Sequence, residues 1–524
     1  MFVPFILIYS QDDQSNNPNV ELPDFVITGQ DVVSIKRTDK MRPDLVSTIT
    51  EVFVKPYHSP EELGLRQLSN PIKKELNILD STKYFNGSFK AGGGIYLLPE
   101  ADLSYHVPFS NGLLNLGVGG FNQRAYVDNS DRLSFYGTAG IEYTISMDDN
   151  GLSGTNFLLD GNYTTSNYKL FASNNPEMKR TKNAGNYSLG IKNTTGRTFI
   201  IDLNLKDYFT SLTEDNFTEN LISAYGFAKL QVSDVGLGLK SNFQSQILNS
   251  DSLNSLSNNY LFLRPTVSFE LFGSVKTEVG YSFNNQNGET FNDIFAAFGL
   301  KLSDNIVLMG EFAPQADFIT SGLFFRKNDY FNPFGFDNIM VRKANYIGAV
   351  VKYEYERYYQ IDAGFKHYKA GNLPYFTDSN LSGQFEIATA DAREFNGFLN
   401  VLFHTGPYGV FYFNIDYYNI TNSDGKRLPY YPKFTGNLTY GYELSRGLLG
   451  EVLVDYFSDR YTDIENTNKL SSFFNLGAKL TYKIQESFIV YLEATNILNR
   501  DIYYWNNYIE KPFDLLAGIN LLFD

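Results

Sequence analysis

The sequence contains no cysteine, one tryptophan and four histidines among its 524 residues. Without cysteine, the chain can form neither disulfide bonds nor thiolate metal sites. It also has no run of 18 apolar residues, which excludes an apolar helix that crosses a membrane. The formal net charge of −15 argues against a nucleic-acid partner. These absences therefore exclude thiol chemistry and helical membrane insertion, and they argue against nucleic-acid binding.

The few histidines indicate neither a metal site nor a catalytic centre. His58, His106, His367 and His404 are far apart in the sequence, and none has a spacing typical of metal ligands. The acidic stretch at residues 148–151 lacks the spaced ligands of a calcium loop and is typical of a hairpin turn. No motif indicates a Ser-His-Asp triad. We therefore expect no enzymatic activity, no metal and no cofactor.

Aromatic residues, in contrast, are abundant, since 38 Tyr and 45 Phe bring the aromatic share to 16%. Both residue types favour β-strands and gather in the interfacial girdles of membrane barrels. The end of the chain shows the pattern most clearly. Alternate residues there form one apolar face: Phe513, Leu515, Ala517, Ile519, Leu521 and Phe523. Such alternation is typical of a strand in an outer-membrane barrel.

The same alternation recurs from about Tyr84 to the C-terminus. Ala478 and Leu480, for example, are predicted to face lipid, whereas Lys479 and Thr481 face the lumen. Segments of about 10 to 18 residues repeat without a helical interruption, which suits tilted membrane strands better than the shorter strands of a soluble sandwich. We therefore predict an all-β fold, a transmembrane antiparallel β-barrel over residues 84–524.

The connections predict the strand count and the orientation. Short turns are expected near residues 193–196, 233–235, 273–274, 303–305, 354–357, 405–407, 445–447 and 485–486. Longer connections are expected near residues 173–184, 210–218, 248–258, 316–339, 370–384, 421–431, 460–469 and 497–510. Strict alternation of the two indicates periplasmic turns opposite extracellular loops, in a barrel of about 22 strands within a range of roughly 20 to 24. A lumen of that width must be plugged or it leaks.

The residues before the barrel are expected to form a short N-terminal periplasmic segment. Residues 1–10 contain an apolar run that turns polar at Gln11, as at the end of a secretory signal peptide; the alternative is an apolar tail of no consequence. Residues 11–83 follow. Within them, residues 46–54 are expected to make one strand and residues 60–76 a short helix or two.

Several motifs resemble the TonB-dependent outer-membrane receptors. They are Tyr431-Pro432-Lys433-Phe434, the aromatic run at residues 456–461, and Asn496-Ile497-Leu498-Asn499 with the aromatic cluster that follows it. The terminal Phe523 is similar to the signal that the outer-membrane assembly machinery recognises in its clients. The resemblance covers residues 84–523. It implies a lipid-embedded barrel in the outer membrane of a Gram-negative-type bacterium.

A short stretch near the N-terminus resembles the energy-coupling box of the same family, the TonB box. It consists of Leu22, Pro23, Asp24, Phe25, Val26, Ile27, Thr28 and Gly29. The resemblance implies TonB as a periplasmic partner, which would bind the stretch as an added strand through main-chain hydrogen bonds. The alternative is a short hydrophobic strand of the N-terminal segment.

The chain departs from that family in its plug. The receptors carry a folded plug domain between the box and the barrel, whereas only residues 30–83 are available here, without the Gly-rich and Arg-Gly elements of a plug. Three functions stay open. The first is uptake of a bulky nutrient such as a metal chelate or glycan. The second is a plugless scaffold, binding subunit or passive channel, and the third and least favoured is an enzyme barrel with a nucleophile and base at one rim.

The long connection at residues 316–339 is the candidate ligand loop. Its aromatic residues are Phe324, Phe325, Tyr330, Phe331, Phe334 and Phe336. Aromatic faces can stack on sugars or planar small molecules. The alternative is that these rings pack the loop itself or belong to the outer girdle.

Overall fold

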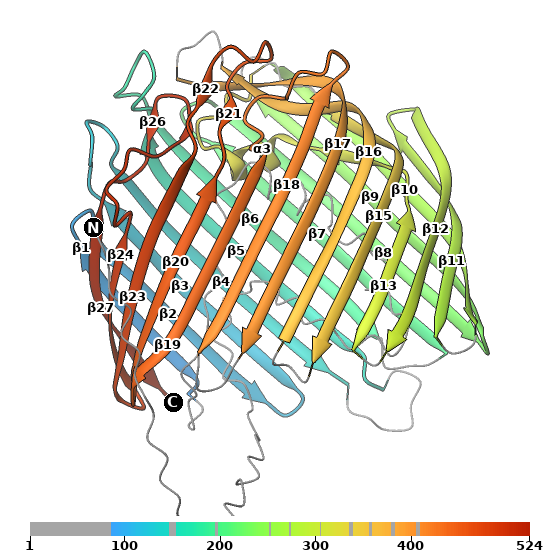
Figure 1. Cartoon of the computed structure of the whole chain (residues 1–524), viewed down its shortest axis with the longest axis horizontal. Helices are drawn as coiled ribbons and strands as arrows, with labels where there is room; N and C mark the ends of the chain where they lie inside the picture. Colours follow the sequence, from blue (N-terminus) through green and yellow to red (C-terminus); the bar gives the residue numbers. More distant parts are fainter. Residues whose placement is uncertain are drawn as a thin grey trace, which may run out of the picture. The chain divides into compact units, whose positions relative to one another are not determined.

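The structure, a computed structural model, describes residues 85–145, 153–193, 198–250, 253–271, 274–303, 305–334, 339–355, 359–378, 383–404 and 409–524. Within them, 22 strands follow one another around a closed antiparallel barrel (Figure 1). The first strand, β1 (Gly87–Gly94), pairs with β2 (Leu97–Phe109) on one side. On its other side it pairs with the last strand, β27 (Asp514–Phe523), which closes the barrel. The predicted fold class and strand count are confirmed.

The other wall strands pair in sequence order. The first half contains β3 (Gly112–Gln123), β4 (Arg132–Thr144), β5 (Asn156–Lys169), β6 (Lys179–Asn193), β7 (Phe199–Leu212), β8 (Phe217–Val232), β9 (Val235–Ser250), β10 (Leu253–Leu271), β11 (Val275–Gln286) and β12 (Glu289–Ser303). The second half contains β13 (Ile306–Phe312), β15 (Ile339–Tyr355), β16 (Tyr359–Asp378), β17 (Phe385–His404), β18 (Val410–Asn422), β19 (Phe434–Ser445), β20 (Leu448–Phe457), β23 (Phe473–Gln485) and β24 (Phe488–Thr495).

Two small hairpins lie in the loops. They are β21 (Arg460–Tyr461) with β22 (Lys469–Leu470), and β25 (Tyr503–Trp505) with β26 (Tyr508–Ile509). Figure 1 shows them at the end of the barrel opposite the C-terminus. Because barrels with an even number of strands keep their short turns and chain ends on the periplasmic side, the end with the hairpins is the extracellular mouth.

The outer face of the barrel is apolar because alternate side chains of each strand point out of the wall. In β27, Leu515, Leu521 and Phe523 are exposed on the outside, whereas Asp514 and Leu516 are buried. This alternation agrees with the facing predicted from the sequence. An apolar outer belt on a closed barrel is what the hydrocarbon core of a bilayer requires, so the strands span a membrane. No helix in the described part of the chain is long and apolar enough to cross a membrane.

The connections differ in part from the prediction. The expected short turns separate successive strands, as where β19 ends at Ser445 and β20 begins at Leu448. Two expected long loops are wrong, since only residues 213–216 separate β7 from β8 and only residues 251–252 separate β9 from β10. Leu212, Phe217 and Leu248, which lie beside these turns, are buried in the main hydrophobic cluster. Because these side chains are buried, the strands of both hairpins continue through residues that the sequence predicted to be loops. The loop expected at residues 370–384 is shorter than predicted, because β16 continues to Asp378.

Candidate functional site

One loop folds back into the barrel. After β13, residues 313–334 (the inward segment) form β14 (Gln315–Ile319) and the helix α3 (Ser321–Lys327). One edge of β14 pairs with β15. At its other edge, the backbone N–H of Ala316 donates to Asn284 Oδ1 over 3.1 Å, and the carbonyl of Ala316 accepts from the Tyr260 hydroxyl over 2.5 Å. Because Asn284 and Tyr260 belong to β11 and β10, β14 lies against the inner face of the wall.

A buried wall carboxylate holds the start of α3. The backbone N–H groups of Ser321 and Gly322 donate to Glu219 of β8, the first over 3.1 Å. Gln246 of β9 donates to the same carboxylate. The first N–H groups of a helix have no partner within the helix, so an anionic acceptor there stabilises the helix start. Since Glu219 belongs to the wall, the contact also fixes the position of α3 in the lumen.

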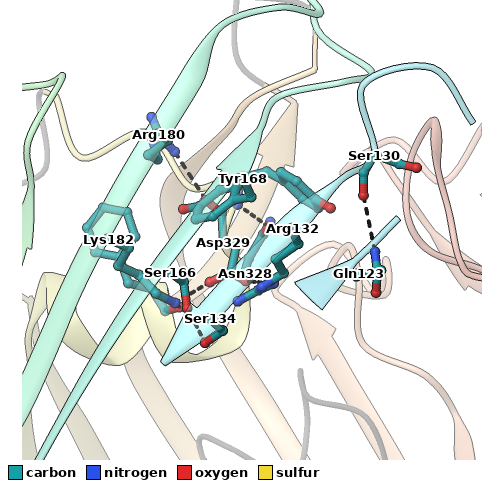
Figure 2. Close-up of polar contacts among 12 residues, drawn as sticks. Gln123, Ser130, Arg132, Ser134, Ser166, Tyr168, Arg180, Lys182, Asn328 and Asp329 are labelled. Atoms are coloured by element: carbon teal, nitrogen blue, oxygen red, sulfur yellow. Dashed lines mark hydrogen bonds and ion pairs between the residues drawn. The ribbon is translucent and has the colours of Figure 1, made fainter. Parts of the chain in front are cut away.

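An ion cluster holds the turn that follows α3. Arg132 of β4 donates to the Asp329 carboxylate over 2.7 Å, and Lys182 of β6 donates to its other oxygen. We call these three residues the Asp329 cluster. Figure 2 shows them together with Tyr168 of β5, whose hydroxyl donates to the Asp329 carbonyl over 2.8 Å. Burial opposes ionisation of Asp329, but the charges of Lys182 and Arg132 prevail and hold the pKa of its carboxyl well below the usual range.

A second ion pair lies beside this cluster. Arg180 of β6 is fully buried, and its Nε donates to Asp215 over 2.8 Å. Its Nη1 donates to the carbonyls of Asp329 (3.1 Å) and Phe331 (2.9 Å). In the described chain, neither Nη2 of Arg180 nor Nε of Arg132 has a hydrogen-bond partner. The wall therefore presents more cationic donors to this turn than the turn itself satisfies.

The end of the inward segment meets the opposite part of the wall. The backbone N–H of Asn332 donates to the carbonyl of Phe385 in β17 over 2.7 Å, and the N–H of Phe385 donates to the Tyr330 carbonyl over 3.2 Å. Tyr330 stacks on Tyr508 of β26 with ring centroids 3.4 Å apart. The inward segment thus starts at β13, contacts β8, β6 and β4, and ends on β17. Because these strands lie on different sides of the closed barrel, the segment crosses the mouth.

The predicted ligand-loop aromatics mostly lie inside this packing. Phe324, Phe325 and Phe331 are each 1% exposed or less, and the Phe331 ring contacts the other two at centroid distances of 5.5 and 4.9 Å. Tyr330 and Phe334 are half-buried, and Phe336 lies outside the described residues. In this structure other protein rings occupy the faces of the three buried phenylalanines. Of the described members of the set, Tyr330 and Phe334 are the two that reach solvent.

The other predicted sites are placed as follows. Phe523 ends β27 opposite Gly87, with its ring stacked on Tyr105 at a centroid distance of 6.2 Å, and its role in assembly stays a prediction. The TonB-box-like stretch at residues 22–29 and the expected strand and helices at residues 46–76 lie outside the described residues.

The described histidines make ordinary contacts: His106 pairs with Asn115, and His367 with the Glu394 carbonyl, each over 2.8 Å. Among the described residues, no group of three or more His, Asp or Glu side chains is arranged to hold a metal ion.

Sequence reasoning missed the Asp329 cluster and Glu219. The partners of Asp329 are 197 and 147 positions away in the sequence, so no local spacing could connect them. One weak signal was present. Arg132, Arg180 and Lys182 are cationic residues at lumen-facing positions near the extracellular ends of strands, which is where a folded loop would require partners of opposite charge.

No known protein family matches the sequence, and no curated protein does. Solved structures do match. The FrpB iron transporter from Neisseria meningitidis (F3-3 variant) gives a TM-score of 0.63 at 10% identity, over 85% of this chain and 82% of that chain. The ferric enterobactin receptor PfeA from Pseudomonas aeruginosa gives 0.61 at 10% identity, over 84% and 80%. The ferric-catecholate import receptor Fiu from Escherichia coli K12 gives 0.60 at 10% identity, over 85% and 82%. The chain therefore has the fold of these outer-membrane receptor barrels.

Proposed function

We propose that the protein is a receptor-like barrel of the outer membrane that binds a bulky nutrient at its extracellular loops and admits it through the lumen. The inward segment is the observation that carries this proposal. A barrel of 22 strands is too wide for its own wall side chains to fill. Here a segment of the wall's own chain lies across the mouth. Polar contacts hold part of this segment in place, and water or a ligand could replace them. A regulated entrance requires contacts that can be replaced in this way.

A metal chelate is the nutrient class that the fold favours. The matching structures are named as an iron transporter, a ferric enterobactin receptor and a ferric-catecholate import receptor. A glycan stays the alternative, because Phe334 is a half-buried aromatic residue that could stack on a sugar. Growth of a deletion strain on iron chelates or on glycans as the limiting nutrient distinguishes these two classes. A growth defect confined to glycan media would contradict the chelate assignment.

TonB is the proposed energy source for moving the inward segment. If residues 22–29 pair with TonB as an added strand, Val26→Pro removes a backbone donor and fixes φ, which breaks the pairing. We expect the purified C-terminal domain of TonB to bind the wild-type protein and to lose binding to the proline variant. Thr28→Val, which keeps the backbone donor and the strand preference, is the matched control. Binding that survives Val26→Pro would show that the contact lies elsewhere.

A second candidate function is that of a plugless binding subunit or scaffold. The observation that favours it is the burial of Phe324, Phe325 and Phe331, which gives the mouth an apolar core that a simple entrance would not need. A barrel of this kind would stay closed and would not bind TonB. The same binding assay therefore decides between the two functions, because absence of TonB binding by the folded wild-type protein favours the scaffold.

A further inference from the structure

We propose that Arg132 and Lys182 form a carboxylate-binding site at the extracellular mouth, and that Asp329 of the inward segment is its resident occupant. A carboxylate group of an incoming ligand takes the place of the Asp329 side chain and so removes the ion pairs that hold the turn at residues 328–331 to β4 and β6. The backbone contacts of the turn with Arg180 and Tyr168 are then left to hold it, and they break as it lifts. The inference deepens the proposed function, on which it rests, because it names a chemical group that the transported ligand carries and the contact that this group breaks.

The geometry of the site is that of a carboxylate receptor. The two oxygens of the Asp329 carboxylate are shared between two cations from different strands, Arg132 and Lys182. The side chains of the three residues are 29%, 14% and 19% exposed, so the site can be reached from solvent without unfolding the wall. A guanidinium and an ammonium that converge on one carboxylate form charge-assisted hydrogen bonds, which are stronger than neutral ones.

The charge balance couples release of the turn to anion binding. Arg180 is neutralised by Asp215, whereas Arg132 and Lys182 share the carboxylate of Asp329. A second acidic group, Glu510, lies near Arg132, and burial raises the pKa of its carboxyl to about 7. If the turn lifted with no anion present, two partly buried cations would lose their partner, which is costly. If an external carboxylate enters as Asp329 leaves, both cations keep a partner. An anion that binds only the lifted state must shift the equilibrium toward that state.

The unpaired donors nearby favour an external ligand of higher charge than Asp329. Nε of Arg132 and Nη2 of Arg180 have no hydrogen-bond partner in the described chain, and Arg180 is fully buried. Buried donors without partners are rare in folded proteins. A dicarboxylate could satisfy such donors as well as those that Asp329 now occupies. This gives the ligand an advantage over the single carboxylate of the aspartate.

Movement of the turn can be measured at Ser166. This serine of β5 is 2% exposed, points inward and lies beside the Asp329 cluster in Figure 2. Since the chain has no cysteine, Ser166→Cys introduces a single thiol of similar size. A membrane-impermeant maleimide should label it slowly while the turn is in place, because the position is buried. Ser423→Cys, at an exposed position in the loop between β18 and β19, is the matched control and should be labelled quickly in every state.

Binding is tested with malonate as the probe and malonamide as its neutral analogue, on the purified full chain in detergent. Asp329→Asn removes the competing charge, so we expect malonate to bind this variant at least tenfold more tightly than wild type by calorimetry. Adding Arg132→Gln and Lys182→Gln to Asp329→Asn should abolish binding, and malonamide should bind none of the three proteins. Equal malonate affinity in wild type and Asp329→Asn would overturn the proposal.

The labelling assay leaves Asp329 intact and so does not depend on the folding of that variant. We expect malonate, but not malonamide or an equal ionic strength of sodium chloride, to raise the labelling rate at Ser166→Cys several-fold without changing it at Ser423→Cys. An unchanged rate at saturating malonate would refute the release step. Both assays are independent of TonB and of transport. If the protein proves not to bind TonB or transport a nutrient, the malonate results still stand. If malonate fails to bind or to release the turn, the TonB and growth assays are likewise unaffected.

Discussion

Arginine at Leu480 should destabilise the barrel much more than arginine at the next residue. Leu480 is 43% exposed on the outer face and lies one residue from the middle of the 13-residue strand β23. It pairs with Gly450 and Leu492 of the neighbouring strands, and its central place in β23 puts it near the midplane of the bilayer. A lipid-facing arginine at that depth costs about 2 to 4 kcal/mol, and this lowers the folding equilibrium on the order of 30-fold to 700-fold. Thr481 alternates into the lumen, where arginine stays hydrated.

The single tryptophan gives the assay its signal. Trp505 is 8% exposed and packs against Phe376 and Tyr430 at centroid distances of 4.8 and 5.1 Å. Its fluorescence should therefore change when the barrel unfolds in guanidinium chloride from phospholipid vesicles. We expect the free energy of unfolding to fall by about 2 to 4 kcal/mol in Leu480→Arg and by less than about 1 kcal/mol in the matched Thr481→Arg. Equal losses in the two variants would refute the assigned facing of β23.

Three further predictions concern the barrel seam and the mouth. Gly87→Val should place a side chain where the Phe523 ring lies and so lower the yield of heat-modifiable barrel, and an unchanged yield would contradict the packing of this seam. Arg180→Met should cost about 3 to 5 kcal/mol in urea unfolding because it leaves Asp215 buried without its cation, and Arg180→Met with Asp215→Leu should cost less than the single change. Because the folded pKa of Asp329 is depressed, its ion pairs are complete above the pKa of an unfolded aspartate, about 4, and are lost only as the pH falls through the lower folded value. Glu510, which lies near Arg132, has a pKa raised by burial to about 7, so the test is made in a Glu510→Gln background. There the thiol reporter at position 166, normalised to the exposed-loop reporter, should label at the same relative rate at pH 5 and pH 7, and faster labelling at pH 5 would contradict the ion cluster.

The sequence predicted the wall of this barrel well because a strand between lipid and lumen has a period of two residues. Leu480 and Phe523 lie on the faces that the alternation assigned to them. The loops were harder to predict. Leu212 and Phe217 extend a hairpin beyond the membrane because they pack against a cluster assembled from distant loops. No pattern within a single strand records such packing.

The inward segment could not be predicted for a related reason. Its aromatic residues are compatible with an open ligand loop or with a packed one, and the choice depends on what the wall offers them. Glu219 and Arg132 make that choice, yet the sequence around each of them does not show which distant segment it contacts. The period of a strand shows that a side chain faces the lumen. It does not show what lies opposite.

The two kinds of contact in the mouth have different tasks. Phe324, Phe325 and Phe331 supply most of the stabilisation, since burying each phenyl ring is worth about 1.5 to 3 kcal/mol whatever its orientation. Burial of this kind is not directional and would permit many arrangements of the segment. Glu219 and Asp329 select one of them, because each requires partners at fixed positions on the wall. A ligand that replaces one polar contact therefore need not supply the energy of the apolar core. It needs only to break the polar contact that selects one arrangement of the segment. The segment can then repack along the wall while its phenyl rings stay out of water.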